Sequence, residues 1–350
     1  MIKLTSRELV KQTLEFKNTE GIVPRDLWTL PWAYNHYGDL VRAILLEYPP
    51  DIIRVPESHL LYGKKPISSG SLYEEGESVD EWGVIFKNIQ RGVIGEVKSP
   101  IVNPGDEDWT DLSRVHFPME LLTVDTAKIN EFCTGTDKFV LSSVQVNPFE
   151  RMQFLRGTEA LFCDLALENP GMLKMLERLH DFNCRLVEHW CKNTKIDGFF
   201  IADDWGTQKT LLINPLVWVK YFKPKYRDYV DIAHQNGKKL FFHSDGNTLD
   251  IIPHFIELGV DAVNLQIFCI GIEKIAQFRG KITFWGEIDR QHLLPHGKIE
   301  EIYAAVHSVH SAIWENGGAI AQCEFGAAAN PENVRQVYES WAKLSRACST

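Results

Sequence analysis

A histidine and an aspartate stand two residues apart at the end of an apolar run. His243 and Asp245 follow residues 239–242, which predict a buried strand. Side chains alternate between the two faces of a strand, so both would project from one face. Far downstream, Cys323 ends a second apolar run that begins at Ala319. Imidazole, carboxylate and thiolate are ligands of zinc, and an open fourth position is typical of catalytic zinc sites. We therefore predict a zinc site made by His243, Asp245 and Cys323.

Acidic side chains end two further apolar runs. Adjacent strand residues face opposite ways, so only one of Asp203 and Asp204 is expected to face a site, while the other caps a helix or forms an ion pair. Glu287 and Asp289 would share a face and could supply a proton, a metal ligand or a salt bridge. We predict that Asp204 and Glu287 are catalytic. Asp203, Gln208 and Asp289 are predicted to contact the substrate.

Each predicted metal ligand also has a structural interpretation. A histidine at a strand end is often only hydrogen-bonded, Asp245 could cap a turn or a helix, and Cys323 could be a buried thiol. Glu324 is a less favoured fourth ligand because it would face away from its neighbour Cys323. Trp28 and Trp32 are predicted to form a flat apolar wall for an aromatic substrate, although large aromatic side chains also fill cores.

Alternating strand and helix patterns position these residues. Helical periodicity separates most of eight β-rich runs, an alternation that favours a (β/α)₈ barrel with its chemistry at the C-terminal ends of the strands. The strands are expected at about 22–30, 51–57, 139–146, 197–204, 238–245, 262–266, 282–289 and 319–324. The helices are expected at about 149–168, 170–194, 215–236, 247–258, 271–279, 298–316 and 330–347.

Length and spacing favour one large domain over residues 1–350, since no linker-like segment divides the chain. Residues 58–138 are too many for a simple connection, and we expect them to form an insertion over the barrel mouth. Within it, residues 80–86 and 92–95 predict a hairpin.

Composition excludes several classes of partner. The formal net charge of −10 argues against a surface for nucleic acids or anionic membranes. No run approaches the roughly 20 apolar residues of a membrane span. Seven cysteines without paired spacing indicate reduced thiols. We therefore expect a cytoplasmic protein.

Six segments, in order and spacing, make the chain resemble the uroporphyrinogen decarboxylase superfamily over nearly its whole length. They are Asp80-Glu81-Trp82-Gly83, Leu155-Arg156-Gly157, Ala202-Asp203-Asp204-Trp205-Gly206-Thr207-Gln208, His243-Ser244-Asp245-Gly246-Asn247, Trp285-Gly286-Glu287-Ile288-Asp289 and Asn330-Pro331-Glu332-Asn333. The resemblance implies a (β/α)₈ barrel. It also implies one of two activities, that of a cofactor-free tetrapyrrole decarboxylase or that of a zinc methyltransferase that exchanges methyl groups with a corrinoid protein.

The decarboxylase branch of this superfamily binds a substrate with many carboxylates through an arginine-rich N-terminal segment. The corresponding residues here, 22–32, include one arginine, Arg25, and two tryptophans. A polyanion would meet too little positive charge there. The sequence therefore disfavours decarboxylation of uroporphyrinogen itself.

The methyltransferase branch carries His-x-Cys on one strand and a lone cysteine on the last. This chain resembles that pattern through His243 and Cys323, with Asp245 at the middle cysteine's position. A carboxylate is a harder ligand than a thiolate and keeps zinc more Lewis acidic, which favours an oxygen or nitrogen leaving group, as in a methoxylated aromatic substrate. The resemblance implies a corrinoid (cobalamin) carried by a partner protein that docks transiently at the barrel mouth. The alternatives are a lyase on a smaller carboxylated substrate and a non-catalytic binding protein.

Overall fold

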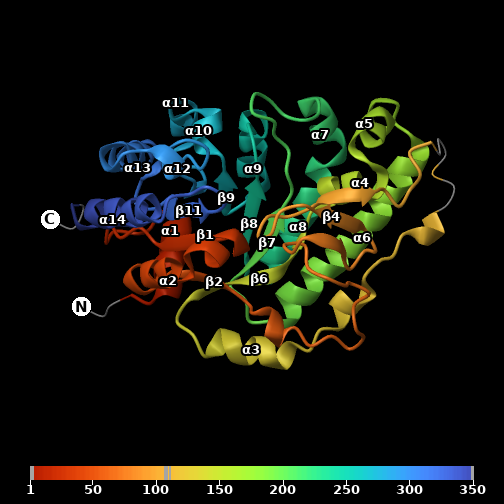
Figure 1. The fold of residues 1–350 in the computed structure, drawn as a ribbon, viewed down its shortest axis with the longest axis horizontal. Coiled ribbons are helices and arrows are strands. Elements are labelled where there is room, and N and C mark those ends of the chain that lie inside the picture. The colour runs from red at the N-terminus through yellow and green to blue at the C-terminus, as the bar shows by residue number, and fades with distance from the viewer. Residues whose placement is uncertain (1–3, 106–108, 110–111, 348–350) are drawn as a thin grey trace.

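Eight parallel strands form the centre of the molecule (Figure 1). The computed structural model describes residues 4–105, 109 and 112–347. The strands are ordered β1-β11-β10-β9-β8-β7-β6-β2, and the Asp51 N–H donates to the Arg25 carbonyl oxygen (2.7 Å) where the two outer strands meet. The sheet is thus a nearly closed barrel, which confirms the predicted (β/α)₈ architecture. Each predicted run corresponds to one strand, and only β11 extends beyond its run, by one residue. The strands are β1 Arg25–Thr29, β2 Ile52–Arg54, β6 Phe139–Val146, β7 Gly198–Ala202, β8 Lys239–Ser244, β9 Ala262–Leu265, β10 Thr283–Gly286 and β11 Ala319–Phe325.

Helices surround the barrel, and a glycine explains one break between them that the sequence did not predict. The predicted helix at 149–168 is two helices, α4 and α5, because Gly157 between them has φ +86°. In the described part of the chain, no helix has both the length and the apolar character needed to cross a bilayer. The helices are α1 Ser6–Leu14, α2 Pro31–Glu47, α3 Thr126–Thr134, α4 Pro148–Arg156, α5 Thr158–Ala166, α6 Pro170–Asn193, α7 Pro215–Tyr221, α8 Lys223–Gln235, α9 Ile252–Leu258, α10 Ile267–Ile270, α11 Ile272–Ile275, α12 Leu293–His296, α13 Ile299–Ile313 and α14 Pro331–Ala347.

Alternate residues of the strands point into the barrel. The residues between them pack on the helices, as Phe242 of β8 does on Phe255 of α9, with ring centroids 4.5 Å apart. The inward-facing strand side chains form their own apolar cluster together with Val10 and Leu14 of α1. The strand members are Ile52, Phe139, Leu141, Phe200, Ala202, Phe241, Ala262, Trp285 and Ile320, with Trp28 packed against them. Because alternation continues along each strand, the polar side chains that follow these positions by two residues gather above this cluster.

The segment between β2 and β6 carries a second sheet. Its antiparallel strands are β3 Gly76–Val79, β4 Ile85–Asn88 and β5 Glu96–Ser99, and Figure 1 shows them in orange and yellow near α4. The predicted hairpin was misplaced, because residues 80–83 and 92–95 lie in the connections on either side of β4. Gly92 meets the start of α2 so closely that a Cβ there would lie 2.5 Å from the Trp32 Cα. The assignment of this segment as an insertion within a single domain stays a prediction.

Candidate active site at the barrel mouth

A cavity of about 710 Å³ opens above the inward-facing apolar cluster. It lies at the C-terminal ends of the strands, where (β/α)₈ enzymes bind their substrates. Residues of the β2–β6 segment, among them Leu72, Tyr73 and Glu81, form part of its wall. Its aromatic lining is Trp28, Tyr73, Phe86, Phe154 and Phe200. Its ionisable lining includes Asp26, Arg54, Asp80, Glu81, Glu150, Arg151, Asp204, His243 and Glu324.

Asp204, His243 and Asp245 converge at this mouth. Each offers one ligand atom, and these atoms all lie within 4.8 Å of one another. The His243 Nε2 is 3.6 Å from the Asp204 Oδ1 and 3.7 Å from the Asp245 Oδ1, distances too long for hydrogen bonds. The backbone N–H of Asp245 donates to the Asp204 Oδ1 (2.8 Å), which holds that carboxylate in place.

Asn264 of β9 sets the protonation of the imidazole. Its Nδ2 donates to the Trp285 carbonyl oxygen (2.7 Å) and to the Gln322 Oε1 (3.1 Å), so its Oδ1 is left to accept from the His243 Nδ1–H at 2.7 Å. A carbonyl oxygen can only accept, which fixes the orientation of the amide. In neutral His243 the lone pair of Nε2 therefore points toward the two carboxylates. Such an arrangement is typical of a metal-binding histidine, whose other ring nitrogen is held by an oxygen.

These three side chains fit a divalent cation. An imidazole lone pair and two carboxylate oxygens all carry negative potential, so they can share this space only around a cation or a proton. The buried Asp245 Oδ1 accepts no hydrogen bond of normal geometry from the described residues. Burial and the charge of Asp204 raise the pKa of nearby Glu150 well above its ordinary value, which reflects the concentration of acidic groups. One nitrogen and two oxygen ligands suit zinc and leave a coordination position open.

The structure does not bring Cys323 to this cluster. Its thiol is buried on the outer face of β11, with Sγ 3.7 Å from the Tyr338 hydroxyl oxygen of α14, and burial raises its pKa to about 12. The neighbouring Glu324 is the β11 side chain that lines the cavity. The expectation that Cys323 joins His243 and Asp245 is therefore wrong, because the alternation of β11 turns the thiol outward, and Asp204 lies beside them instead.

Asp245 is held from the other side by Arg290, a residue that the sequence analysis missed. Its guanidinium donates to the Asp245 Oδ2, lies 3.0 Å from the Glu324 Oε2 and lies 3.3 Å from the Glu287 Oε1. Burial acts to raise the pKa of Asp245, but His243 and Arg290 outweigh it and the pKa is lowered. The available signal was the position of Arg290 directly after the motif that ends at Asp289.

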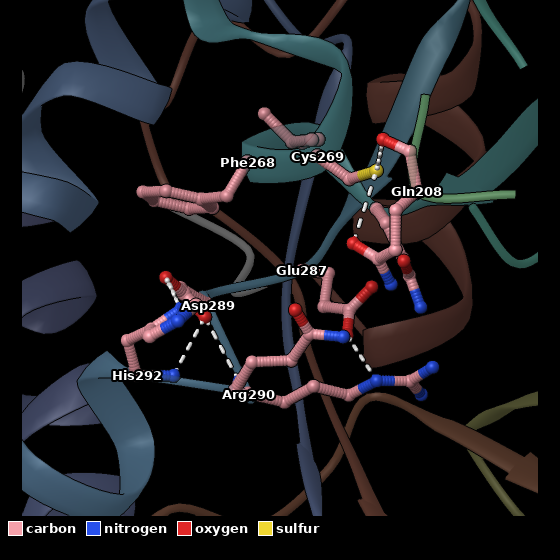
Figure 2. A pocket seen from close by; sticks show the side chains of 10 residues that line it. Gln208, Phe268, Cys269, Glu287, Asp289, Arg290 and His292 are labelled. Atoms are coloured by element: carbon pink, nitrogen blue, oxygen red, sulfur yellow. Dashed lines mark hydrogen bonds and ion pairs between the residues drawn. The ribbon is translucent and has the colours of Figure 1, made fainter. Parts of the chain in front are cut away.

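Glu287 stands between this cluster and a smaller pocket of about 350 Å³ (Figure 2). Burial raises its pKa to about 8, so its carboxyl group holds a proton at neutral pH. Gln208 and Asp289 line the same smaller pocket. The Asp289 carboxylate stabilises the turn that follows it, because its Oδ1 accepts hydrogen bonds from the backbone N–H groups of Gln291 (2.8 Å) and His292 (2.9 Å).

Asp203 and Trp32 lie outside the large cavity. The fully buried Asp203 carboxylate accepts hydrogen bonds from the backbone N–H groups of Phe149 and Glu150 and from the Tyr226 hydroxyl, and so caps the start of α4. Trp32 stacks on His36 at the start of α2, with ring centroids 4.1 Å apart. Both had been predicted to contact substrate, and the structure gives them these packing and capping contacts instead. Trp28, by contrast, lines the cavity.

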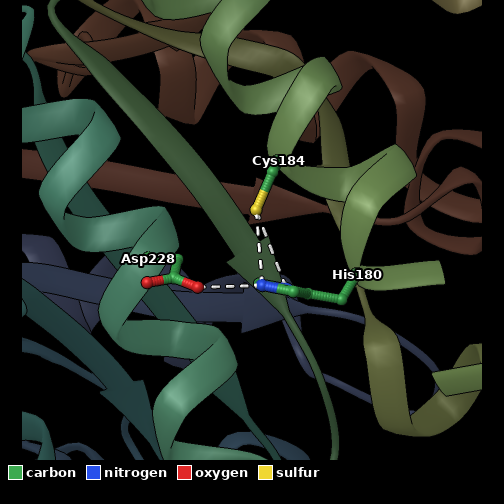
Figure 3. Close-up of side chains that lie close together, drawn as sticks. All are labelled: His180, Cys184 and Asp228. Atoms are coloured by element: carbon green, nitrogen blue, oxygen red, sulfur yellow. Dashed lines mark hydrogen bonds and ion pairs between the residues drawn. The ribbon is translucent and has the colours of Figure 1, made fainter. Parts of the chain in front are cut away.

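A second group of possible ligands, His180, Cys184 and Asp228, lies on α6 and α8 (Figure 3). Here both ring nitrogens have partners, since Nε2 is 2.9 Å from the Asp228 Oδ2 and Nδ1 is 3.0 Å from the Tyr229 hydroxyl oxygen. Burial raises the pKa of Cys184 to about 12, which keeps it a thiol. This group is satisfied without an ion and is a packing contact between two helices.

Comparison with known proteins places the chain in a family. A solved methyltransferase from Methanosarcina mazei is similar over 97% of this chain and 99% of its own, with a TM-score of 0.65 and 13% identity. A D-psicose 3-epimerase (TM-score 0.39, 12% identity, 65% of this chain and 86% of that one) shares too little of the structure to inform function. No curated protein matches the sequence. The family model for uroporphyrinogen decarboxylase (URO-D) matches residues 93–344. The chain therefore belongs to the uroporphyrinogen decarboxylase family.

Proposed function

We propose that the chain is a methyltransferase that holds zinc through Asp204, His243 and Asp245 and moves a methyl group from a small substrate to a corrinoid carried by another protein. The observation that carries this proposal is the convergence of one imidazole lone pair and two carboxylates at the barrel mouth. The likeness to a methyltransferase across nearly the whole chain agrees with it.

The leaving oxygen or nitrogen gains negative charge as the methyl group departs, so the reaction needs a group that compensates this charge. Bound zinc would supply Lewis acidity to that oxygen or nitrogen. Glu287 would supply a proton, because its carboxyl group is protonated at neutral pH and its buried Oε1 accepts no hydrogen bond of normal geometry among the described residues. The methyl group would pass to the corrinoid of the partner protein as its bond to the leaving atom breaks, and the leaving atom would keep the electron pair and take the proton of Glu287. Arg290 keeps Asp245 and Glu287 in place.

The charges of the cavity disfavour a substrate with many carboxylates. Two of the cations at the mouth are already paired, Arg290 with three acidic side chains and Arg151 with Asp80 and Glu81. Acidic residues outnumber basic ones in the lining. A lyase acting on a smaller carboxylated substrate is the second candidate function, and it is favoured by Arg54, which has no such pairing with any described residue.

Metal content tests the proposal. We expect the purified protein to contain about one zinc ion, and we expect His243→Ala and Asp204→Ala to lose most of it. Cys323→Ala and Cys184→Ala are matched controls that should retain zinc, because both thiols pack away from the cluster. Full zinc occupancy in the His243→Ala, Asp204→Ala double variant would contradict the site.

Activity is tested by mixing the protein with a reduced corrinoid protein and a panel of methoxylated aromatics and methylamines. Methylation of the cobalt is followed by visible absorption. We expect methyl transfer by the wild type and by Cys323→Ala and none by His243→Ala. Release of carbon dioxide by zinc-free protein would move the assignment to the lyase.

A further inference from the structure

Arg54 is the cation of the cavity that has no carboxylate partner within the described residues. Arg290 and Arg151 both lie within 4.0 Å of carboxylate oxygens. No hydrogen bond or ion pair joins Arg54 to a described residue, although it lines the same cavity. A guanidinium taken out of bulk water without a partner is costly, so a protein that keeps one at a binding site generally uses it for a ligand.

The position of Arg54 follows from the barrel alternation. Ile52, two residues earlier on β2, belongs to the inward-facing cluster, so Arg54 projects from the same face at the C-terminal end of the strand. Its Cζ lies 3.9 Å from the centroid of the Phe200 ring and 5.7 Å from that of Trp28. The stacked ring orients the guanidinium, and the donors at the edge of the guanidinium remain able to bind an acceptor.

Asp26 is the acidic residue whose charge acts most strongly on Arg54, but no ion pair joins its carboxylate to the guanidinium. Its Oδ2 accepts from the indole N–H groups of Trp28 and Trp285, each at 3.0 Å. Burial raises its pKa to about 6, even though the charge of Arg54 acts to lower it. Asp26 thus holds the two indoles, and Arg54 is left for a molecule in the cavity.

The same indole connects Arg54 to the candidate metal cluster. The centroid of the Trp28 ring is 5.7 Å from the Arg54 Cζ and 5.1 Å from the centroid of the His243 ring. A molecule lying along this indole can therefore reach both the Arg54 guanidinium and the His243 imidazole. Trp28 and Phe200, whose ring centroids lie 6.0 Å apart, provide aromatic surface along that path.

We propose that Arg54 binds the carboxylate of an aromatic carboxylic acid substrate, whose ring lies against Trp28 with its methyl-bearing substituent directed toward His243. The direction of the methyl group rests on the proposed function, whereas binding of the carboxylate does not. Planar, bidentate pairing with a carboxylate is the geometry that a guanidinium favours.

Direct binding tests this assignment. The probes are 4-methoxybenzoate and its uncharged isostere 4-methoxybenzamide, titrated into the purified protein by calorimetry. A charge-assisted pair in a partly buried site should make the carboxylate bind roughly 10- to 100-fold more tightly than the amide. Arg54→Met should abolish this preference, and Arg54→Lys should restore part of it. Arg335→Met is the matched control, because Arg335 pairs with Glu47 at the surface and should leave the preference unchanged.

Three results overturn the proposal: equal affinities in the wild type, no measurable binding of the carboxylate, or an undiminished preference in Arg54→Met. Thermal unfolding of each variant tests whether it is folded. If Arg54→Met does not fold, the preference of Arg54→Lys for the carboxylate is the test, and a preference as large as that of the wild type overturns the proposal. His243→Ala separates this proposal from the previous one. It should lose zinc but keep the preference for the carboxylate, whereas a carboxylate bound by the metal itself would lose that preference.

Discussion

At the scale of single residues, the candidate site depends on which atoms carry protons. Asn264 assigns the proton of His243 to Nδ1, and burial keeps a proton on Glu287. Arg290 stands between Asp245 and Glu287 and compensates for the negative charge around it. The proposed metal ligand Asp245 and the proposed proton donor Glu287 can therefore exist side by side, because their environments lower the pKa of Asp245 and raise that of Glu287.

Removal of the Asn264 amide should weaken metal binding. Asn264→Ala leaves the His243 tautomer unfixed, and we expect the affinity for zinc to fall roughly 10- to 100-fold. Competition with a chromophoric chelator measures the change. Asn193→Ala, at an exposed position of α6, is the control. Unchanged affinity in Asn264→Ala would show that this amide does not orient the ligand.

Glu287 should make the protein less stable as the pH rises. Its pKa in the folded state is about 8, above the ordinary value of 4.5, so between these values the folded state holds a proton that the unfolded state has lost. The free energy of unfolding therefore falls as pH rises through this window. Glu287→Gln mimics the protonated side chain, and we expect it to flatten this slope and to add on the order of 1–3 kcal/mol at the upper end. Urea unfolding at several pH values measures both, and a slope as steep as in the wild type would refute the assignment.

At the scale of elements, the adjacent acids at the end of β7 have different tasks. Asp204 faces His243, while Asp203 turns outward and accepts two hydrogen bonds from the start of α4 and one from the Tyr226 hydroxyl of α8. The strand alternation thus couples a helix cap to the candidate site. The same alternation on β11 directs Glu324 into the cavity and Cys323 toward α14.

Loss of the Asp203 cap should destabilise the fold without removing the metal. Asp203→Ala leaves two backbone N–H groups and the Tyr226 hydroxyl without their acceptor, which costs roughly 2–4 kcal/mol. Chemical denaturation followed by circular dichroism gives the free energy of unfolding. Asp204→Ala is the neighbouring control and should show the reverse pattern, a smaller loss of stability with loss of zinc. Equal effects of the two variants on zinc would contradict this division of roles.

At the scale of the whole molecule, the proposed partner that carries a corrinoid would have to approach the open mouth of the barrel. The connection between β4 and β5 stands at that mouth, where Ile94 lines the cavity and Ile89 is 86% exposed. An exposed apolar side chain beside a cavity is typical of a surface that another protein covers. Leu46, 84% exposed, lies at the opposite end of the barrel, just before the start of β2.

Replacement of Ile89 should therefore weaken binding of the corrinoid protein and leave binding of the small substrate unchanged. We expect Ile89→Asp to raise the KM for the corrinoid protein about tenfold, with binding of the small substrate unchanged. Leu46→Asp is the control of equal exposure and should leave both unchanged. Steady-state kinetics with varied corrinoid protein measure the effect. The same KM in both variants would remove the β4–β5 connection from the docking surface.

The sequence by itself determined the eight strands, the barrel and the pairing of His243 with Asp245, because apolar runs and two-residue spacing are local properties. It did not determine which face of β7 and β11 points inward. Both strands are buried on both faces, so Cys323 and Glu324 carry no pattern of apolar and polar residues that separates inside from outside. Only the closed barrel decided this, by turning Glu324 and Asp204 inward. It also brought Arg54, Asn264 and Arg290 to one end of the barrel from strand ends far apart in the chain, a proximity that no local spacing encodes.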